Sequence, residues 1–217
     1  FSSYDAYHTC PFQFYHTRIA KTYVQAPSQP MLWGNDVHKA IEDYAKEGKP
    51  VPDTMQRFMP IVDRILNAPG DNYVELELAV TIDLQPTGFW SDDAWCRGKG
   101  DIIKVNGDKG FSGDWKTGKW KEASLQLDLA TVMTFATFPE LKTVTTAFIY
   151  FQEPSKPVSK RFTREQIPAI MEQFAAGVRD MEYSEKMGVW PKKPSGLCKA
   201  YCPVQECEYF QKGARRW

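Results

Sequence analysis

The hydrophobic pattern of the chain changes from helical to strand periodicity near residue 73, and this change limits the folds that the chain can adopt. Before it, apolar residues recur at helical spacing, as at Val37, Ile41 and Tyr44. From residue 74 to residue 80, apolar and mostly acidic residues alternate, as in a half-exposed β-strand. We therefore expect helices first and a β-sheet after them.

Elements of both kinds can be assigned along the rest of the chain. The predicted helices are residues 2–24 (interrupted near Pro11), 32–45, 54–67 (kinked at Pro60), 124–138 and 164–187. The predicted strands are residues 73–81, 94–105, 109–116 and 143–151, and the turn Asn106-Gly107-Asp108 joins the second to the third as a hairpin. This order predicts an α/β protein with a mixed β-sheet flanked by helices.

The size and charge of the chain narrow its class. A chain of 217 residues can bury one core, so we expect a single domain. Within it, residues 1–70 form a helical region, 71–187 the core with the sheet, and 188–217 a Cys-rich tail. The 27 basic and 27 acidic residues cancel, which gives no support for a broad basic coat for nucleic acid but does not exclude one basic cleft. No run is apolar enough to span a membrane.

The segment Gly113-Asp114-Trp115-Lys116-Thr117-Gly118 carries a candidate active site. In a strand, Asp114 and Lys116 point the same way. A carboxylate can hold a divalent cation, and an ammonium two residues along can orient a water or steady a phosphate. The pair therefore predicts metal-dependent phosphodiester hydrolysis, although Asp-x-Lys also occurs as a solvated charge pattern.

A second carboxylate, Asp101, closes the preceding predicted strand, after Lys99-Gly100. If the two strands pair as a hairpin, Asp101 and Asp114 can share one cation. Mg²⁺ and Mn²⁺ prefer oxygen ligands and suit such a pair. The alternative is an ordinary acid at the edge of a strand.

Four more residues are candidates for this site. His38 could be a third ligand of a metal such as Mn²⁺, but a lone helical histidine is more often structural. Gln126 opens the helix after the Asp-x-Lys strand, either as a polar residue of that turn or as a hydrogen-bonding group over the water or phosphate. Glu75 and Glu77 share one strand face, and one of them could approach the metal. Both are second-tier candidates for the metal site, because solvated acids on strands are common.

Basic and aromatic residues offer contacts for DNA. Arg97, Lys99, Lys119 and Lys121 lie beside the acids in the sequence and are candidate phosphate contacts. The aromatic residues of the N-terminal segment could stack on unpaired bases, but we expect most of them to be core residues.

The chain has five cysteines, an odd count that argues against a simple disulfide framework. Cys198, Cys202 and Cys207 cluster near the C-terminus, so a site with four thiolates needs Cys10 or Cys96. Zn²⁺ and an iron–sulfur cluster both accept four cysteines, and buried free thiols are the third possibility.

Taken together, the motifs resemble those of the RecB-type PD-(D/E)XK nucleases. The cysteines resemble the split set of the iron–sulfur branch, which includes AddB nuclease domains, CRISPR-adaptation exonucleases and small phage exonucleases. The motifs are, in chain order, Ser3-Tyr4 with Cys10-Pro11-x-x-Phe14, Gly34-x-x-x-His38, Gly100-Asp101, Asp114-Trp115-Lys116-Thr117-Gly118, Gln126-Leu127-x-Leu129-Ala130 and Cys198, Cys202-Pro203 and Cys207.

The resemblance implies a restriction-endonuclease-like core and a role for each matching residue. The metal ligands would be His38, Asp101, Asp114 and the Trp115 carbonyl. Lys116 would orient the attacking water and Gln126 would support it. A [4Fe–4S] cluster would be held by Cys10, Cys198, Cys202 and Cys207, while Cys96 would have no role. The last three ligands are spaced by three and then four residues instead of two and five, so Zn²⁺ stays open as the alternative.

The resemblance also implies a function. We expect a Mg²⁺- or Mn²⁺-dependent DNA exonuclease that acts on single-stranded or double-stranded ends in the cytoplasm of a bacterial host, away from membranes. Its small size and lack of helicase motifs favour recombination, repair or replication of phage or mobile-element DNA, with a possible annealing or recombination partner protein. The alternatives are a structure-selective flap endonuclease with the same site and a non-catalytic DNA-binding module of a recombination complex.

Overall fold

The computed structural model describes residues 2–24, 26–122, 125–153, 155–199 and 201–211. The chain divides into two compact units. The sheet unit comprises residues 28–170, and the terminal unit comprises residues 1–27 and 171–217, which are the two ends of the chain. The expected single domain stays a prediction, and residues 212–217 of the predicted tail lie outside the described residues.

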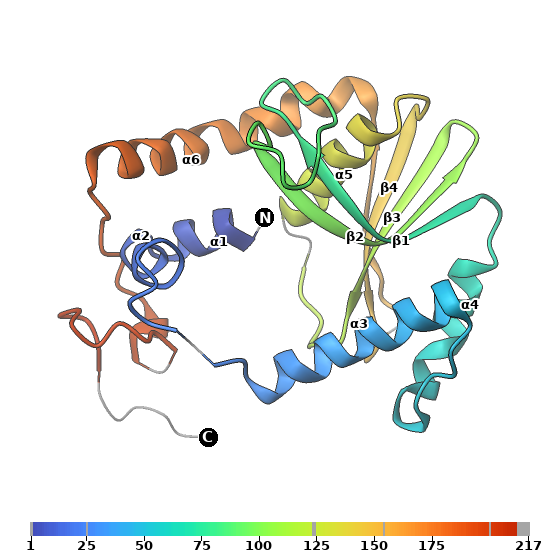
Figure 1. Ribbon diagram of the computed structural model, residues 1–217, viewed down its shortest axis with the longest axis horizontal. Coiled ribbons are helices and arrows are strands. Elements are labelled where there is room, and N and C mark those ends of the chain that lie inside the picture. The colour runs from blue at the N-terminus through green and yellow to red at the C-terminus, as the bar shows by residue number, and fades with distance from the viewer. Residues whose placement is uncertain (1, 25, 123–124, 154, 200, 212–217) are drawn as a thin grey trace. The chain divides into compact units, whose positions relative to one another are not determined.

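The sheet unit contains five strands in the order β1-β2-β3-β4-β5 (Figure 1). They are β1 (Asp71–Val80), β2 (Cys96–Asn106), β3 (Lys109–Lys116), β4 (Thr143–Tyr150) and β5 (Val158–Thr163). Neighbouring strands of this sheet run antiparallel, except β3 and β4, which are parallel. The helices are α3 (Gln29–Glu47), the 3₁₀ helix η2 (Asp53–Phe58), α4 (Met59–Leu66), α5 (Leu125–Thr137) and the 3₁₀ helix η3 (Arg164–Gln166). The sheet is therefore mixed, as predicted.

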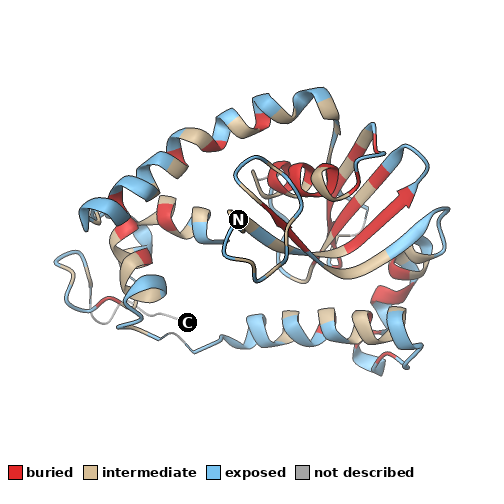
Figure 2. Cartoon of the chain, turned by 45° about the horizontal axis from the view of Figure 1, so that its top comes forward, coloured by how far each residue is buried: buried red, intermediate tan, exposed pale blue. Residues whose placement is uncertain are grey.

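Helices cover both faces of this sheet. On one face, Val37 and Ile41 of α3 pack in a buried cluster with Ile102, Trp115 and Ile149 of the strands. On the other face lies α5, most of whose residues are buried (Figure 2). Burying one such aliphatic side chain contributes roughly 1.5–3 kcal/mol. These clusters fix both α3 and the strands that carry the candidate site.

The strands β2 and β3 separate beside the candidate site. They pair from Asn106↔Lys109 to Ile102↔Gly113, whereas β2 stays paired with β1 as far as Val80↔Cys96. Asp101 and Asp114 are the first residues beyond this pairing, so the two acids flank the fork between the strands. Asp101 consequently lies within β2, and the expectation that it closes a strand is wrong.

Two other elements differ from the prediction. Strand β5 was not expected, because its apolar alternation is short and broken by Lys160, whose ammonium binds Asp128 of α5. Pro60 lies in the first turn of α4, where proline is tolerated, so the expected kink is a change from the 3₁₀ helix η2 to α4. Ser124, the predicted start of the helix that became α5, lies outside the described residues.

The terminal unit is built from short helices and loops. It contains α1 (Ser2–Thr9), α2 (Pro11–Phe14), the π-helix η1 (Tyr15–Ile19), most of α6 (Ile167–Met187) and the 3₁₀ helix η4 (Gly196–Lys199). Tyr7 is buried, and its hydroxyl lies 2.7 Å from that of Ser184. Tyr15 stacks on Trp190 with ring centroids 5.2 Å apart. No helix in the described part of the chain is long and apolar enough to cross a membrane.

Candidate active site

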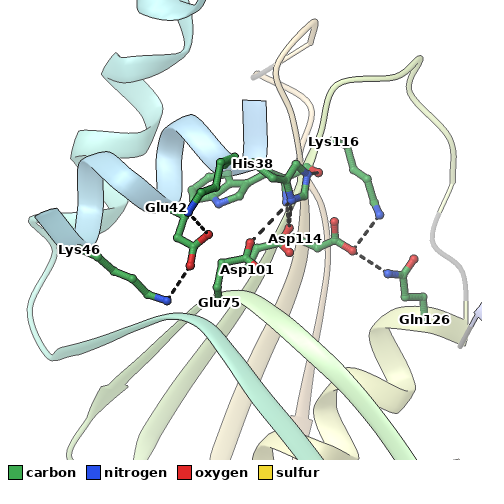
Figure 3. A network of polar contacts seen from close by, with 10 residues as sticks. His38, Glu42, Lys46, Glu75, Asp101, Asp114, Lys116 and Gln126 are labelled. Carbon is green, nitrogen blue, oxygen red and sulfur yellow. Dashed lines mark hydrogen bonds and ion pairs between the residues drawn. The ribbon is translucent and has the colours of Figure 1, made fainter. Parts of the chain in front are cut away.

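Three potential metal ligands from three elements meet at the fork. The ligand atoms of His38 on α3, Glu75 on β1 and Asp101 on β2 all lie within 4.8 Å of one another (Figure 3). His38 Nδ1 lies 3.4 Å from Asp101 Oδ2 and 3.9 Å from Glu75 Oε1. The structure thus brings together two predicted ligands, His38 and Asp101, and the weaker candidate Glu75.

The imidazole of His38 is oriented by the end of β3. Its Nε2 donates a hydrogen bond of 2.9 Å to the Trp115 carbonyl, which leaves Nδ1 facing the acids. One turn earlier on α3, Gly34 allows the close approach of this helix, since a Cβ atom there would lie 3.3 Å from Thr117 Oγ1. The spacing Gly34-x-x-x-His38 therefore puts a contact point and an imidazole on one face of α3.

Asp101 takes the place of a missing sheet hydrogen bond. Its Oδ2 accepts a hydrogen bond of 2.8 Å from the Trp115 amide, just where β2 no longer pairs with β3. The carboxylate is therefore held on both sides, by a backbone amide of β3 and by His38. Such a fixed carboxylate is suited to holding a cation in one position.

Glu75 enters the site through an unusual backbone conformation. Its φ of 51° lies in the left-handed region, which costs a non-glycine residue roughly 1–2 kcal/mol. Its neighbours Val74 and Leu76 pair with Ile102 and Gly100 of β2 in one register. Glu75 itself does not pair with Asp101. Glu77 instead lies 3.7 Å from Lys99 as an ion pair. Of the two glutamates, Glu75 is therefore the one that approaches the candidate site, and its role as a ligand stays a prediction.

Asp114 joins a second group of polar side chains (Figure 3). Its Oδ2 accepts hydrogen bonds from Lys116 Nζ at 2.8 Å and from Gln126 Nε2 at 2.7 Å. The ammonium of Lys116 also lies 4.7 Å from the centre of the Phe148 ring. Asp114 and Lys116 do point the same way, and Gln126 reaches them from the first turn of α5.

The close approach of these groups changes their protonation. Burial lowers the pKa of His38, but its hydrogen bond with Asp101 and the charges of Asp101 and Asp114 outweigh burial and raise the pKa to about 9. Burial, helped by the charge of Asp101 and opposed by Lys116, raises the pKa of Asp114 to about 6. Burial and the charge of Asp101 also raise the pKa of Glu75. A cation among these acids would relieve their mutual repulsion.

A cleft at the site is lined by one face of α3, by Glu75, and by the end of β3 with the residues that follow it. Glu42, one turn beyond His38, is a lining residue that was not predicted. The signal was available, because residues four apart on a helix share a face. The predicted phosphate contacts Arg97, Lys99, Lys119 and Lys121 are all exposed, and their role stays a prediction.

The cysteines separate into two groups. Cys10, Cys198, Cys202 and Cys207 line one cavity of the terminal unit. Cys96 lies on β2 in the sheet unit, where its Sγ is 3.8 Å from Met133 Sδ. Among the described residues, no three thiol sulfurs lie within 4.8 Å of one another. The predicted cluster ligands are thus the four cysteines that share a cavity, and Cys96 is apart from them.

Comparisons with known proteins bear on this site. Residues 1–72 match the family model of the PD-(D/E)XK nuclease superfamily. The resemblance to this nuclease superfamily is confirmed. The matched segment contains Gly34 and His38 and ends before Glu75, so it leaves the roles of Asp101, Asp114 and Lys116 as predictions. A search of the curated proteins gave no match.

Solved structures show the fold. The crystal structure of a putative exonuclease from Eubacterium rectale aligns with a TM-score of 0.54 at 12% identity, over 91% of this chain and 84% of that chain. The predicted restriction-endonuclease-like fold is confirmed by this match and by the mixed sheet. The structure titled SSO0001 aligns with a TM-score of 0.34 at 14% identity, over 84% of this chain and 99% of that chain, and this score is too low to show a shared fold.

Proposed function

We propose that this superfamily relative is a divalent-metal-dependent deoxyribonuclease that degrades DNA from an end. The observation that carries the proposal is the convergence of His38, Glu75 and Asp101 beside the pair Asp114 and Lys116. A cation-binding group and an ammonium next to one cleft are what phosphodiester hydrolysis requires. A non-catalytic DNA-binding module would not need both.

The donor set suits Mg²⁺ or Mn²⁺. The ion would be held by His38, Glu75 and Asp101, with Asp114 beside them. Carboxylate oxygens suit both ions, and an imidazole favours Mn²⁺. Burial and the charge of Asp101 raise the pKa of Glu75 although His38 lies near it, and a cation would add positive charge between the two acids. When bound, such an ion neutralises charge on the attacked phosphate and makes a water more acidic.

The chain's own residues would arrange the water and the phosphate. Lys116 has two further N–H donors beyond the one given to Asp114, so its ammonium can hold a water or a phosphate oxygen. Gln126 fixes Asp114 from α5, which keeps the carboxylate and the ammonium at a constant distance. The family resemblance implies that the Trp115 carbonyl is a metal ligand. In this structure it accepts a hydrogen bond from His38, so its proposed role is to orient the imidazole.

We further propose that the four cysteines of the terminal unit hold a [4Fe–4S] cluster. Tetrahedral Zn²⁺ would need sulfur atoms about 3.8 Å apart, as follows from a Zn–S bond of ~2.3 Å. The four thiols line one cavity and no three of their sulfurs lie within 4.8 Å of one another, which suits a larger cluster with one cysteine on each iron. Iron and acid-labile sulfide in the purified protein would support the cluster, and stoichiometric zinc without iron would refute it.

A digestion assay tests the nuclease. We expect Mg²⁺ or Mn²⁺ to support digestion of end-labelled linear DNA, and EDTA to abolish it. Closed circular DNA should survive, whereas a flap endonuclease would instead cut branched DNA internally. Lys116→Ala and Asp114→Ala should each lower the rate by roughly 10²–10⁴-fold, as loss of a proton-transfer or water-orienting group does.

The matched control is Asp108→Ala, which removes an acid from the exposed turn after β2, where Asp108 lies 3.4 Å from Lys142. This variant should digest DNA at the rate of the unaltered protein. The proposal fails if the unaltered protein leaves every form of DNA intact with both metals. It also fails if Lys116→Ala and Asp108→Ala behave alike. Digestion in the presence of a phage annealing protein would test the expected partner and pathway.

A further inference from the structure

The connection between β1 and β2, residues 81–95, displays an aromatic ring that the proposed catalytic site does not use. Trp90 at its tip is 78% exposed. A single exposed apolar residue needs no explanation by itself. The surroundings of Trp90, however, distinguish it from a loose surface side chain.

The connection is held in a defined conformation. The Thr81 amide donates to the Gln85 carbonyl at 2.9 Å, and the Thr87 amide donates to the Ala79 carbonyl at 3.0 Å. The Thr87 hydroxyl lies 2.7 Å from Asp93 Oδ1 and donates to it. These hydrogen bonds present Trp90 on an ordered support, which lowers the entropy lost when a partner binds the ring.

A cation lies against the indole of Trp90. The guanidinium carbon of Arg97 lies 5.4 Å from the centre of the ring, and Arg97 Nη1 donates to the Phe89 carbonyl at 2.9 Å. The Phe89 ring is nearly perpendicular to the indole, with the ring centroids 5.0 Å apart. Arg97 and Phe89 thus both support the indole, and its large exposed fraction leaves part of the ring open to a flat partner.

Strand β2 links this ring to the proposed catalytic site. Arg97 and Lys99 occupy alternate positions and therefore share a face of the strand. At about 3.3 Å per residue, Arg97 lies roughly 13 Å along the strand from Asp101. A DNA strand cut at the fork could thus follow two cationic side chains and bring a base to Trp90 within a few nucleotides of the cut.

We propose that Trp90, backed by Arg97, is a stacking platform for an unpaired base, and that the substrate strand is single-stranded where it passes from the site to this ring. The inference rests on the proposed nuclease function and specifies its substrate. Asp92 and Asp93 lie in the same connection and repel phosphates. Stacking on Trp90 therefore supplies the binding energy there, while Arg97 and Lys99 attract the backbone.

Binding of a labelled single-stranded oligonucleotide in EDTA tests the platform without cleavage. Trp90→Ala should weaken binding roughly ten- to hundredfold, because stacking of one base contributes about 1–3 kcal/mol. Trp90→Phe keeps a π-face and should stay within a few fold of the unaltered protein. The matched control is Ile82→Ala, which trims an exposed apolar residue, 61% exposed, in the same connection.

The salt dependence separates stacking from charge. Trp90→Ala should leave the slope of log K against log salt unchanged, whereas Arg97→Gln should reduce it by roughly 0.7, the value for one phosphate contact on a single strand. Blunt duplex DNA should bind Trp90→Ala and the unaltered protein equally. Equal losses on duplex and single strand would overturn the proposal.

Two further outcomes would also overturn it. The first is that Trp90→Ala binds single strands with the same affinity as Ile82→Ala. The second is that Trp90→Ala changes only the oligomeric state in size-exclusion chromatography, which would make Trp90 a protein contact. Because these assays contain no active metal, they are independent of the digestion assay. A protein that digests DNA while Trp90→Ala binds normally refutes the platform alone, and an inactive protein that stacks DNA on Trp90 refutes the nuclease alone.

Discussion

The two units of the protein are stabilised in different ways. The sheet unit has continuous strand pairing and buried clusters on both faces of its sheet. In the described part of the terminal unit, the buried apolar side chains are few: Tyr7, Pro11, Phe14, Phe174 and Val204. Its contacts join residues far apart in the sequence, such as Tyr7 and Ser184, 177 positions apart. The sheet unit can thus hold its site by packing, whereas the terminal unit needs a further link, which the proposed cluster would supply.

The largest test of this difference removes one cysteine of the terminal unit. Cys198→Ser should make the terminal unit sensitive to protease while the sheet unit stays resistant, because binding of a structural metal centre contributes on the order of 10 kcal/mol to folding. Limited proteolysis followed by mass spectrometry would locate the cleavage sites. The iron content should fall in the same variant.

Cys96→Ser is the matched control, since Cys96 lies on β2 against Met133 and away from the other four cysteines. It should retain iron and a protease-resistant terminal unit. If both variants are digested alike, the terminal unit does not depend on a cluster, and the contrast between the units is wrong.

A smaller effect is expected inside the sheet unit, at a buried ion pair. Both carboxylate oxygens of Asp128 on α5 accept from Lys160 Nζ of β5, at 2.7 and 2.9 Å, and Asp128 is buried. Lys160→Met leaves this carboxylate without its partner, so the sheet unit should lose about 3 kcal/mol of stability. Thermal melting should show a decrease of roughly 10 °C for a unit of this size.

The double variant Asp128→Leu with Lys160→Met is the control, because replacing both charges by apolar groups is often neutral or stabilising. It should recover most of the lost stability. A double variant as unstable as Lys160→Met would mean that the shape of this site, and not its charge, stabilises α5 against β5.

The sequence allowed much of the sheet unit to be predicted, because its signals are local. Helical spacing around Val37 and Ile41 gave α3, and the turn at Gly107 gave the hairpin of β2 and β3. Alternation put Asp114 and Lys116 side by side.

Other features depend on contacts that no local pattern carries. The left-handed conformation of Glu75 is not signalled by the regular alternation of residues 74–80. The fork at Asp101 depends on where β2 leaves β3, which is a matter of sheet geometry. Strand β5 pairs with β4, and its Lys160 binds Asp128, which is 32 residues away in the sequence. Sequence spacing likewise could not show that Cys10 shares a cavity with the C-terminal cysteines, and this part of the prediction came from the family resemblance.

The smallest expected effect tests how closely the packing of the sheet unit positions its site. In Gly34→Ala, the new methyl group would lie 3.3 Å from Thr117 Oγ1, so α3 and the Thr117 side chain must separate by a few tenths of an ångström. Alanine favours a helix over glycine by about 1 kcal/mol, which should offset the tight contact and leave stability nearly unchanged. His38 moves with α3, however, and the Mn²⁺ affinity should fall about tenfold, as it does when a group that orients a ligand is lost. Titration calorimetry of Mn²⁺ would measure this change. Adding Thr117→Ala should restore the affinity by making room for the methyl group, and a Gly34→Ala variant that binds Mn²⁺ normally would show that His38 is positioned by its hydrogen bond to Trp115 alone.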